Sequence, residues 1–179
     1  FYKAAKKSGM CSTIKDLHWD IRPQPGFGTV EVRTMDAVAT IRESVALAAF
    51  LRTLVAYLLE TTPEQRPHGL PTGLPWWANR ENHFRASHRG VDADCLVDED
   101  GSTECLRTSV DHVLEIIAPT ARGLGEEHYL TRIAQMLDRP GYKRQRGVYD
   151  HTGSLQQVSH ALVDELAAEI GGLGSELRA

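Results

Sequence analysis

The sequence carries two charged side chains, two residues apart, in a segment whose composition predicts a β-strand. Glu31 and Arg33 lie in the run 29–33, which has β-branched residues at 29, 30 and 32. Side chains alternate across a strand, so Glu31 and Arg33 share one face, about 6–7 Å apart. A carboxylate can bind Mg²⁺, and a guanidinium can hold a phosphate through two hydrogen bonds. On the pattern alone, a surface strand with a cross-strand ion pair is favoured, and a pair that binds a ligand is the alternative.

A second charged pair, Asp20 and Arg22, stands just upstream. Residues 14–21 have strand character, and on a strand Asp20 and Arg22 share one face. They either bind a substrate or pair for structural reasons, and both interpretations stay open. Asp36 is interpreted as the N-cap of the next helix rather than as a metal ligand, because aspartate is favoured at that position.

Two further sets of polar side chains lie later in the chain. Asn82 and Arg85 are three residues apart on a helix predicted over 76–88, so they share a face. Arg144 and Arg146 belong to a short basic cluster, which is either a phosphate contact or a solvated helix end.

Helical periodicity and turn residues divide most of the chain into helices. Besides 76–88, the sequence predicts helices over 1–9, 37–60, 126–137 and 154–170, and another that begins after Thr108 or Ser109 and includes Ile117. Residues 61–75 are predicted to be a loop, because they hold four prolines. In the helix 37–60, the side chains expected to face the core are Val38, Ile41, Val45, Ala48, Leu51 (or the stem of Arg52), Val55 and Leu58.

A hairpin is predicted where two short apolar runs flank an acidic turn. Residues 95–97 and 103–106 surround Asp98-Glu99-Asp100-Gly101, and Asp-Gly is a strong hairpin signal. A two-residue turn would pair Cys105 with Leu96 and put Cys95 on the other face, so no disulfide is expected. Few strands among many helices predict an α+β fold, with too few strands for a self-contained sheet.

Composition excludes several classes of function. The chain has 179 residues, 41% of them hydrophobic, and a net charge of −4, which argues against a nucleic-acid partner. No apolar run is long enough for a membrane span, and no apolar stretch of a signal peptide follows the first lysines. Three cysteines make no disulfide framework and suggest a reducing compartment, so a cytoplasmic protein is expected.

The motifs around Glu31 resemble those of the glutamate–cysteine ligase type 2 family of carboxylate–amine ligases. That family carries a Trp-Asp-Ile-Arg-Pro segment, a Gly-containing turn, and a Gly-Thr-x-Glu-x-Arg strand followed by an aspartate. This sequence has the three parts in the same order, at 19–23, 28–33 and Asp36.

Two weaker similarities extend the resemblance over nearly the whole chain. Residues 82–86 and 90–93 are similar to the family's Asn-x-Trp-Arg-Ala and Gly-Leu-Asp-Ala stretches, and 145–146 to a Gln-Arg pair near its C-terminus. His88 and Arg89 depart from the family, which usually has an arginine at the first position and an aromatic residue or histidine at the second.

The resemblance implies an ATP- and Mg²⁺-dependent ligase. ATP would phosphorylate a carboxylate, and an amine would then displace phosphate from the acyl phosphate. Glutamate or a similar carboxylate and an amine such as cysteine are the implied substrates, and Glu31 is the implied metal ligand. The other implied site residues are Arg22 and Arg33 for catalysis, and Arg33, Asn82, Arg85 and Arg146 for nucleotide contact.

Family members are much longer than this chain. Residues 1–179 are therefore expected to be the C-terminal portion of the catalytic domain, a mostly helical half of a glutamine-synthetase-like ligase fold without its N-terminal half. On this interpretation the isolated chain is inactive, and a homodimer or an N-terminal partner half is possible. The alternative is a non-catalytic or split-enzyme subunit that needs such a partner to complete the site.

Overall fold

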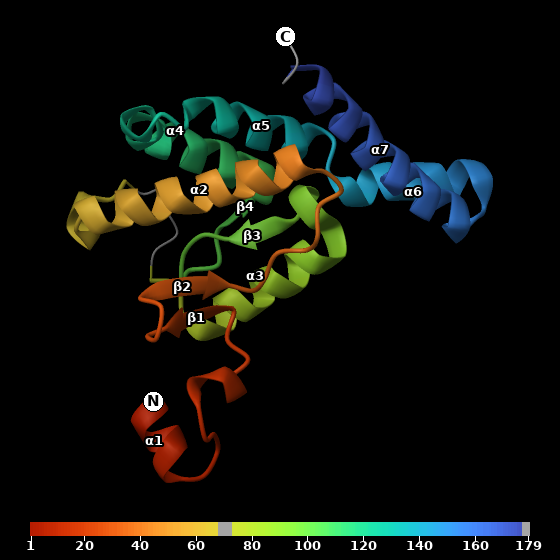
Figure 1. Cartoon of the computed structure of the whole chain (residues 1–179). Coiled ribbons are helices and arrows are strands. Elements are labelled where there is room, and N and C mark those ends of the chain that lie inside the picture. Colours follow the sequence, from red (N-terminus) through yellow and green to blue (C-terminus); the bar gives the residue numbers. More distant parts are fainter. Residues whose placement is uncertain (68–72, 177–179) are drawn as a thin grey trace. The chain divides into compact units, whose positions relative to one another are not determined.

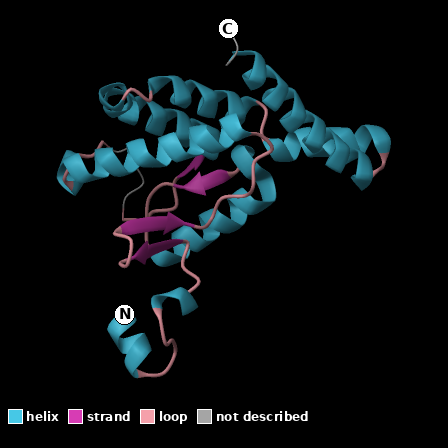
Figure 2. Ribbon diagram, in the orientation of Figure 1, coloured by secondary structure: helices cyan, strands magenta, loops and turns pink. Residues whose placement is uncertain are grey.

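The computed structural model describes the backbone of residues 1–67 and 73–176, and the side chains of these ranges up to residue 172. Part of the predicted loop 61–75 therefore lies outside the described residues. The chain divides into two compact units, Phe1–Ala37 and Val38–Ala179, each with its own elements (Figures 1 and 2).

The first unit contains a short helix, one 3₁₀ turn and a hairpin. These are α1 (Tyr2–Lys7), η1 (Ile14–Asp16), β1 (Ile21–Gln24) and β2 (Thr29–Val32). Ala5, Cys11 and Leu17 form its small buried core.

The strand predicted over 14–21 is wrong for most of its length. Residues Ile14–Asp16 form the 3₁₀ turn instead, because a capping box encloses them. The Asp16 carboxylate accepts hydrogen bonds from the backbone N–H groups of Ser12 and Thr13, at 2.8 and 2.9 Å. Local side-chain capping here overrides the strand preference of the β-branched residues.

The hairpin β1–β2 is antiparallel, and its register places Arg22 opposite Glu31. Phe27 N–H donates to the Gln24 carbonyl across the turn, at 3.0 Å, and Gly28 has a φ of 63°. A positive φ is accessible to glycine at little cost, so Gly28 lets the chain reverse directly into β2.

The second unit is built on three long helices that pack together, α2 (Ile41–Glu60), α4 (Leu106–Leu124) and α5 (Glu127–Asp138) (Figure 1). Ile117, Ala121 and Leu130 form the buried centre of this layer. Phe50, Leu54 and Tyr57 of α2 pack against that centre. The Glu126 carboxylate accepts from Arg52 at 2.5 Å and from Thr53 at 3.2 Å, which ties α2 to the start of α5.

Two predictions for α2 are wrong. Thr40, not Asp36, is the N-cap, since its hydroxyl accepts from the Glu43 N–H. The buried face is Glu43, Ala46, Ala49 and Thr53, whereas Ile41, Val45 and Val55 are exposed. α2 carries two apolar stripes, and the stripe with small residues faces α4 and α5 because small side chains let helices approach closely.

The helix α3 (Trp76–Arg89), as predicted, leads through η3 (Gly90–Asp92) into the hairpin β3 (Asp94–Leu96) and β4 (Thr103–Cys105). The predicted pairing of Cys105 with Leu96 is wrong: Cys105 pairs with Asp94. The turn is longer than two residues, because Val97 N–H bonds the Ser102 carbonyl, and Asp98 accepts from the Ser102 N–H. The described cysteines are free, as expected.

Two helices, α6 (Gly141–Thr152) and α7 (Leu155–Glu176), complete the unit and pack against each other (Figure 1). The sequence did not predict α6, because Pro140-Gly141 was interpreted only as the end of the preceding helix. Pro140 also serves as the N-cap of α6, where its missing N–H leaves no unsatisfied donor. α7 continues past Gly171, where a stop was expected. The α+β prediction is confirmed by two antiparallel strand pairs among these helices.

Candidate functional site

The hairpin β1–β2 brings three side chains singled out by the sequence, Arg22, Glu31 and Arg33, together with Gln24. Glu31 Oε2 accepts from Arg22 Nη2 at 2.7 Å, from Arg22 Nε at 3.1 Å and from Gln24 Nε2 at 2.9 Å. Arg33 Nη1 lies 3.7 Å from the other oxygen, Glu31 Oε1. Glu31 is thus the centre of a small charged network.

Arg22 and Arg33 differ in how they join this network. The Arg22 side chain is buried, at 9% exposure, and also donates to the Lys15 carbonyl at 2.9 Å. The Arg33 side chain is 36% exposed and makes only the longer contact with Glu31 among the interactions described for this hairpin. Arg22 therefore orders Glu31, while the Arg33 guanidinium has donors available for an anionic ligand.

The charge of Glu31 is stabilised by its neighbours. The hydrogen bond from Gln24, followed by that from Arg22, holds the pKa of the Glu31 carboxyl below its ordinary value. The carboxylate thus stays ionised in mildly acidic solution. Its other oxygen, Oε1, has only the longer ion pair with Arg33 at 3.7 Å.

Asn82 and Arg85 lie on one face of α3, as predicted, and that face meets the hairpin β3–β4. Asn82 Nδ2 donates to the Leu96 carbonyl at 2.8 Å, and Leu96 N–H donates to Asn82 Oδ1 at 2.6 Å. Arg85 pairs with Glu81 and donates to the Asp94 carbonyl at 2.9 Å. Both side chains position a strand in the described structure.

Gly90 and Asp92, in the stretch that resembles the family's second motif, hold α6 against η3. Gly90 has a φ of 61°, and a Cβ there would lie 2.4 Å from the Tyr142 ring. Asp92 pairs with Lys143 at 2.5 Å, which lowers the pKa of Asp92 and raises that of Lys143. This segment is explained by close packing of two elements.

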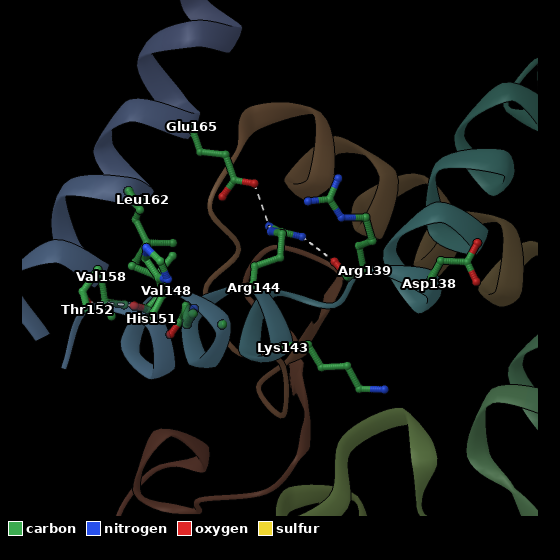
Figure 3. A pocket seen from close by; sticks show the side chains of 13 residues that line it. Asp138, Arg139, Lys143, Arg144, Val148, His151, Thr152, Val158, Leu162 and Glu165 are labelled. Atoms are coloured by element: carbon green, nitrogen blue, oxygen red, sulfur yellow. Dashed lines mark hydrogen bonds and ion pairs between the residues drawn. The ribbon is translucent and has the colours of Figure 1, made fainter. Parts of the chain in front are cut away.

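Arg144 and Arg146 are two residues apart on α6 and have different surroundings. Arg146 is exposed, and its guanidinium carbon lies 5.5 Å from the centre of the Tyr142 ring. Arg144 is mostly buried, with Glu43 2.9 Å from Nη2 and Glu165 2.9 Å from Nε. Figure 3 shows Arg144 between Glu165 and Arg139 at the edge of a cavity of about 650 Å³.

Among the described residues, no three acidic, histidine or cysteine side chains come together in a way that would hold a metal ion. Within the same ranges, no helix is both long enough and apolar enough to cross a membrane.

The sequence profile of the Glutamate-cysteine ligase family 2 (GCS2) matches residues 1–167. The match covers both units and almost every element named above. The chain belongs to this family. The resemblance that rests on residues 19–36 is therefore confirmed.

Curated relatives agree with this assignment. Proteins named "Putative glutamate--cysteine ligase 2" are similar to the chain: 44% identity over 171 residues in Trichormus variabilis, 38% over 170 in Thermobifida fusca, and 35% over 159 in Bdellovibrio bacteriovorus. These matches cover 95, 94 and 88% of this chain but 44, 42 and 41% of the relatives. The chain spans less than half the length of these curated relatives.

Sequence reasoning found the charged hairpin but missed residues that its geometry adds. Gln24 was assigned to no site, although it lies two residues after Arg22 on β1 and reaches the same carboxylate. Glu43 and Glu165 were also missed. The signal for Glu43 was a carboxylate in line with Ala46 and Ala49, on a helix face otherwise made of small residues.

Proposed function

We propose that this chain forms part of an ATP-dependent carboxylate–amine ligase. The reaction would join the side-chain carboxylate of glutamate, or a similar acid, to an amine such as cysteine through an acyl phosphate. The observation that carries the proposal is the family match over residues 1–167, with Glu31 and Arg33 at the positions of its Glu-x-Arg motif.

The chemistry of ligation explains why such a hairpin is useful. A carboxylate is a poor electrophile until it is phosphorylated, and phosphoryl transfer concentrates negative charge between nucleotide and substrate. Arg33 has a permanent charge and an exposed guanidinium, so it suits an anionic phosphate or carboxylate. The buried Arg22 acts as a positioning residue, since it holds Glu31 from the opposite strand.

The proposed Mg²⁺ and ATP have only a partial fit to the described residues. Mg²⁺ prefers several oxygen ligands in octahedral geometry. In the hairpin, Glu31 Oε2 is already saturated by Arg22 and Gln24, and Oε1 alone is left. The described residues therefore do not make a complete magnesium site, and further ligands have to come from elsewhere in the whole enzyme.

Nucleotide contact by Asn82, Arg85 and Arg146 stays a prediction. Arg146 is the best placed of the three, because it is exposed on α6 and its guanidinium has no competing carboxylate among the described ion pairs. Asn82 and Arg85 would have to give up their bonds to β3 to reach a ligand.

The test is ADP release by the natural gene product that contains this chain. Release should need ATP, Mg²⁺, glutamate and an amine together. Arg33→Ala should lower kcat/KM on the order of a hundredfold, because it removes a charge-stabilising donor. Arg122→Ala is the matched control, since Arg122 is an exposed arginine of α4 paired with Glu127. No amine-dependent ADP release, together with no effect of Glu31→Gln, would refute the proposal.

Turnover measurements on the 179-residue chain distinguish the split-enzyme alternative from the main proposal. Alone, it should show no turnover, because the hairpin offers one free carboxylate oxygen where the metal needs several ligands. Turnover that appears only on mixing with a partner polypeptide would identify a split enzyme. Measurable turnover by the chain alone would contradict the partial magnesium fit.

A further inference from the structure

A polar cavity in the second unit gathers the buried side-chain atoms whose hydrogen bonding is incomplete. Among the described residues, the buried side-chain atoms without a hydrogen-bond partner are Glu43 Oε2, Arg132 Nε and Arg144 Nε. All three side chains line one cavity of about 290 Å³ between α2, α5, α6 and α7. Buried polar atoms are rarely left unsatisfied, so their concentration around one space indicates a missing partner.

The other atoms of these side chains are firmly held. Glu43 is 3% exposed, and its Oε1 lies 2.9 Å from Arg144 Nη2. Arg144 Nη1 donates to the Arg139 carbonyl at 2.6 Å, and Nε lies 2.9 Å from Glu165 Oε1 without hydrogen-bond alignment. Arg132 Nη1 donates to Gln135 at 3.1 Å. The unsatisfied atoms therefore cannot relax toward one another without breaking existing contacts.

The helices that form the walls are also tied together next to the cavity. The Glu169 carboxylate of α7, 7% exposed, accepts from the backbone N–H groups of Ile41 and Arg42 at 2.7 and 2.9 Å. Arg144 links α2 to α7 through Glu43 and Glu165. The cavity thus has a fixed shape before any ligand enters, and such preorganisation favours binding.

The unsatisfied atoms would be matched by a ligand that carries both a negative and a positive group. The Arg132 Nε–H donor has no acceptor, and the Arg144 Nε–H is misaligned with its ion-pair partner Glu165, so a ligand carboxylate would serve both. Glu43 Oε2 needs a donor, which a protonated amine supplies. A simple anion would leave Glu43 unsatisfied, and a simple amine would leave Arg132 unsatisfied.

The neighbouring cavity indicates the rest of the ligand. The larger space shown in Figure 3 has Arg139, Arg144 and Glu165 among its lining residues, as does the polar cavity, so the two spaces adjoin at these side chains. Its floor is apolar, formed between α6 and α7 by Val148, Val158, Ala161 and Leu162. A ligand whose charged end occupies the polar cavity would lay an apolar side chain on this floor.

We propose that the space between Glu43, Arg132, Arg144 and the α6–α7 groove binds an α-amino acid with an apolar side chain. The ammonium group would donate to Glu43 Oε2, and the carboxylate would accept from Arg132 and Arg144. The site contains none of the residues that carry the ligase proposal, so its binding test does not depend on that proposal.

The test is titration of the 179-residue chain with L-leucine and two matched probes, followed by calorimetry and backbone amide NMR. 4-Methylpentanoate lacks the amine, and isoamylamine lacks the carboxylate. Leucine should bind at least about tenfold more tightly than either probe, and glycine should bind more weakly than leucine. Amide shifts should concentrate in α5, α6 and α7.

Two variants test the assigned contacts. Arg132→Met keeps the length of the side chain and should weaken leucine binding about tenfold or more. Glu43→Gln should do the same, and Arg132→Met remains decisive if Glu43→Gln does not fold. Arg122→Met, on an exposed face of α4, should bind leucine normally. Leucine binding that matches either probe, that is undetectable at millimolar concentration, or that is unchanged in Arg132→Met would overturn the proposal.

Discussion

At the scale of single residues, Glu31 combines the two interpretations that its pattern left open. The register of the hairpin makes Arg22 its cross-strand partner, and one Glu31 oxygen is consumed by that structural pair. The other oxygen and the exposed Arg33 stay available. The structural ion pair with Arg22 and the proposed ligand-binding pair with Arg33 thus share the same carboxylate.

The acidity of Glu31 gives a direct prediction. Its pKa is lowered in the folded protein by Gln24 and then by Arg22, so the ionised carboxylate stabilises the hairpin. This stabilisation is present above the unfolded value, near 4.5, and is lost as the pH falls through the lower folded pKa. Carboxyl ¹³C NMR should place the Glu31 midpoint below 4.5, and Gln24→Ala should raise it.

The control for that titration is Gln65→Ala, which removes a glutamine from the 3₁₀ turn η2 (Pro63–Gln65), far along the sequence from the hairpin. It should leave the Glu31 midpoint unchanged. A midpoint at or above the ordinary glutamate value, or one that ignores Gln24→Ala, would show that the hydrogen bonds to Oε2 do not form in solution.

The charged hairpin was predictable because its signal is local, whereas the cavity was not. Alternation along one strand puts Glu31 and Arg33 on the same face, whatever the rest of the chain does. Glu43 and Glu165 meet at Arg144 from three different helices, and Glu43 lies 101 positions before Arg144 in the sequence. Spacing within one element carries no information on such a meeting.

At the scale of elements, Asn82 acts as a clamp between α3 and β3. It satisfies both backbone groups of Leu96, a residue that is 8% exposed. Asn82→Ala would leave a buried N–H and a buried carbonyl without partners. The free energy of unfolding should fall by about 2–4 kcal/mol, measured by urea denaturation.

Asn79→Ala is the matched control for this loss. Asn79 is also on α3, is exposed, and makes one side-chain hydrogen bond, to the Leu74 carbonyl. Its replacement should change stability by less than about 0.5 kcal/mol. If Asn82→Ala keeps full stability but loses ATP binding, Asn82 is a nucleotide ligand rather than a clamp.

Gly90 tests how closely α6 approaches η3. At Gly90, alanine would combine an unfavourable positive φ with a Cβ 2.4 Å from the Tyr142 ring. Gly101 has a φ of 92° and no heavy atom within 4 Å of a built Cβ, so Gly101→Ala would carry the backbone cost alone. Thermal unfolding should show Gly90→Ala to be less stable than Gly101→Ala by about 1–3 kcal/mol.

The close approach at Gly90 depends on Tyr142, so the double variant Gly90→Ala/Tyr142→Ala should recover part of the loss. Equal stability of Gly90→Ala and Gly101→Ala would mean that Tyr142 moves aside at no cost. Either result measures a contact between residues 52 positions apart in sequence, which periodicity cannot predict.

Elements were predicted best where their own sequence defines both ends. The helix 76–88 and the helix 126–137 have boundaries set by proline and glycine, and both are found. α6 was missed because Pro140-Gly141 can end one helix and also begin the next. Only the packing of α6 on α7 decides whether a second helix forms after it. The α2 face was misassigned because two apolar stripes compete, and the choice depends on α4 and α5.

At the scale of the whole molecule, the apolar stripe of α2 that was expected in the core lies on the surface instead. Its apolar side chains Ile41, Val45, Val55 and Leu59 are exposed, the last of them at 83%. They recur at intervals that place them along one side of the helix. Contiguous exposed apolar surface favours association in water. The chain is therefore expected to self-associate as its concentration rises, as its sequence had also suggested.

Sedimentation velocity over a range of concentrations measures this association. The double variant Val55→Lys/Leu59→Lys should shift the chain toward monomer, because it places two charges in the C-terminal half of the apolar stripe. Charge alone also changes association, so the matched control is Leu155→Lys/Val163→Lys, which adds the same two charges at exposed apolar positions of α7. If both pairs of substitutions act equally, net charge governs association and the α2 stripe has no special role. If only the α2 pair acts, this stripe is the surface through which the chain meets a further copy or a partner.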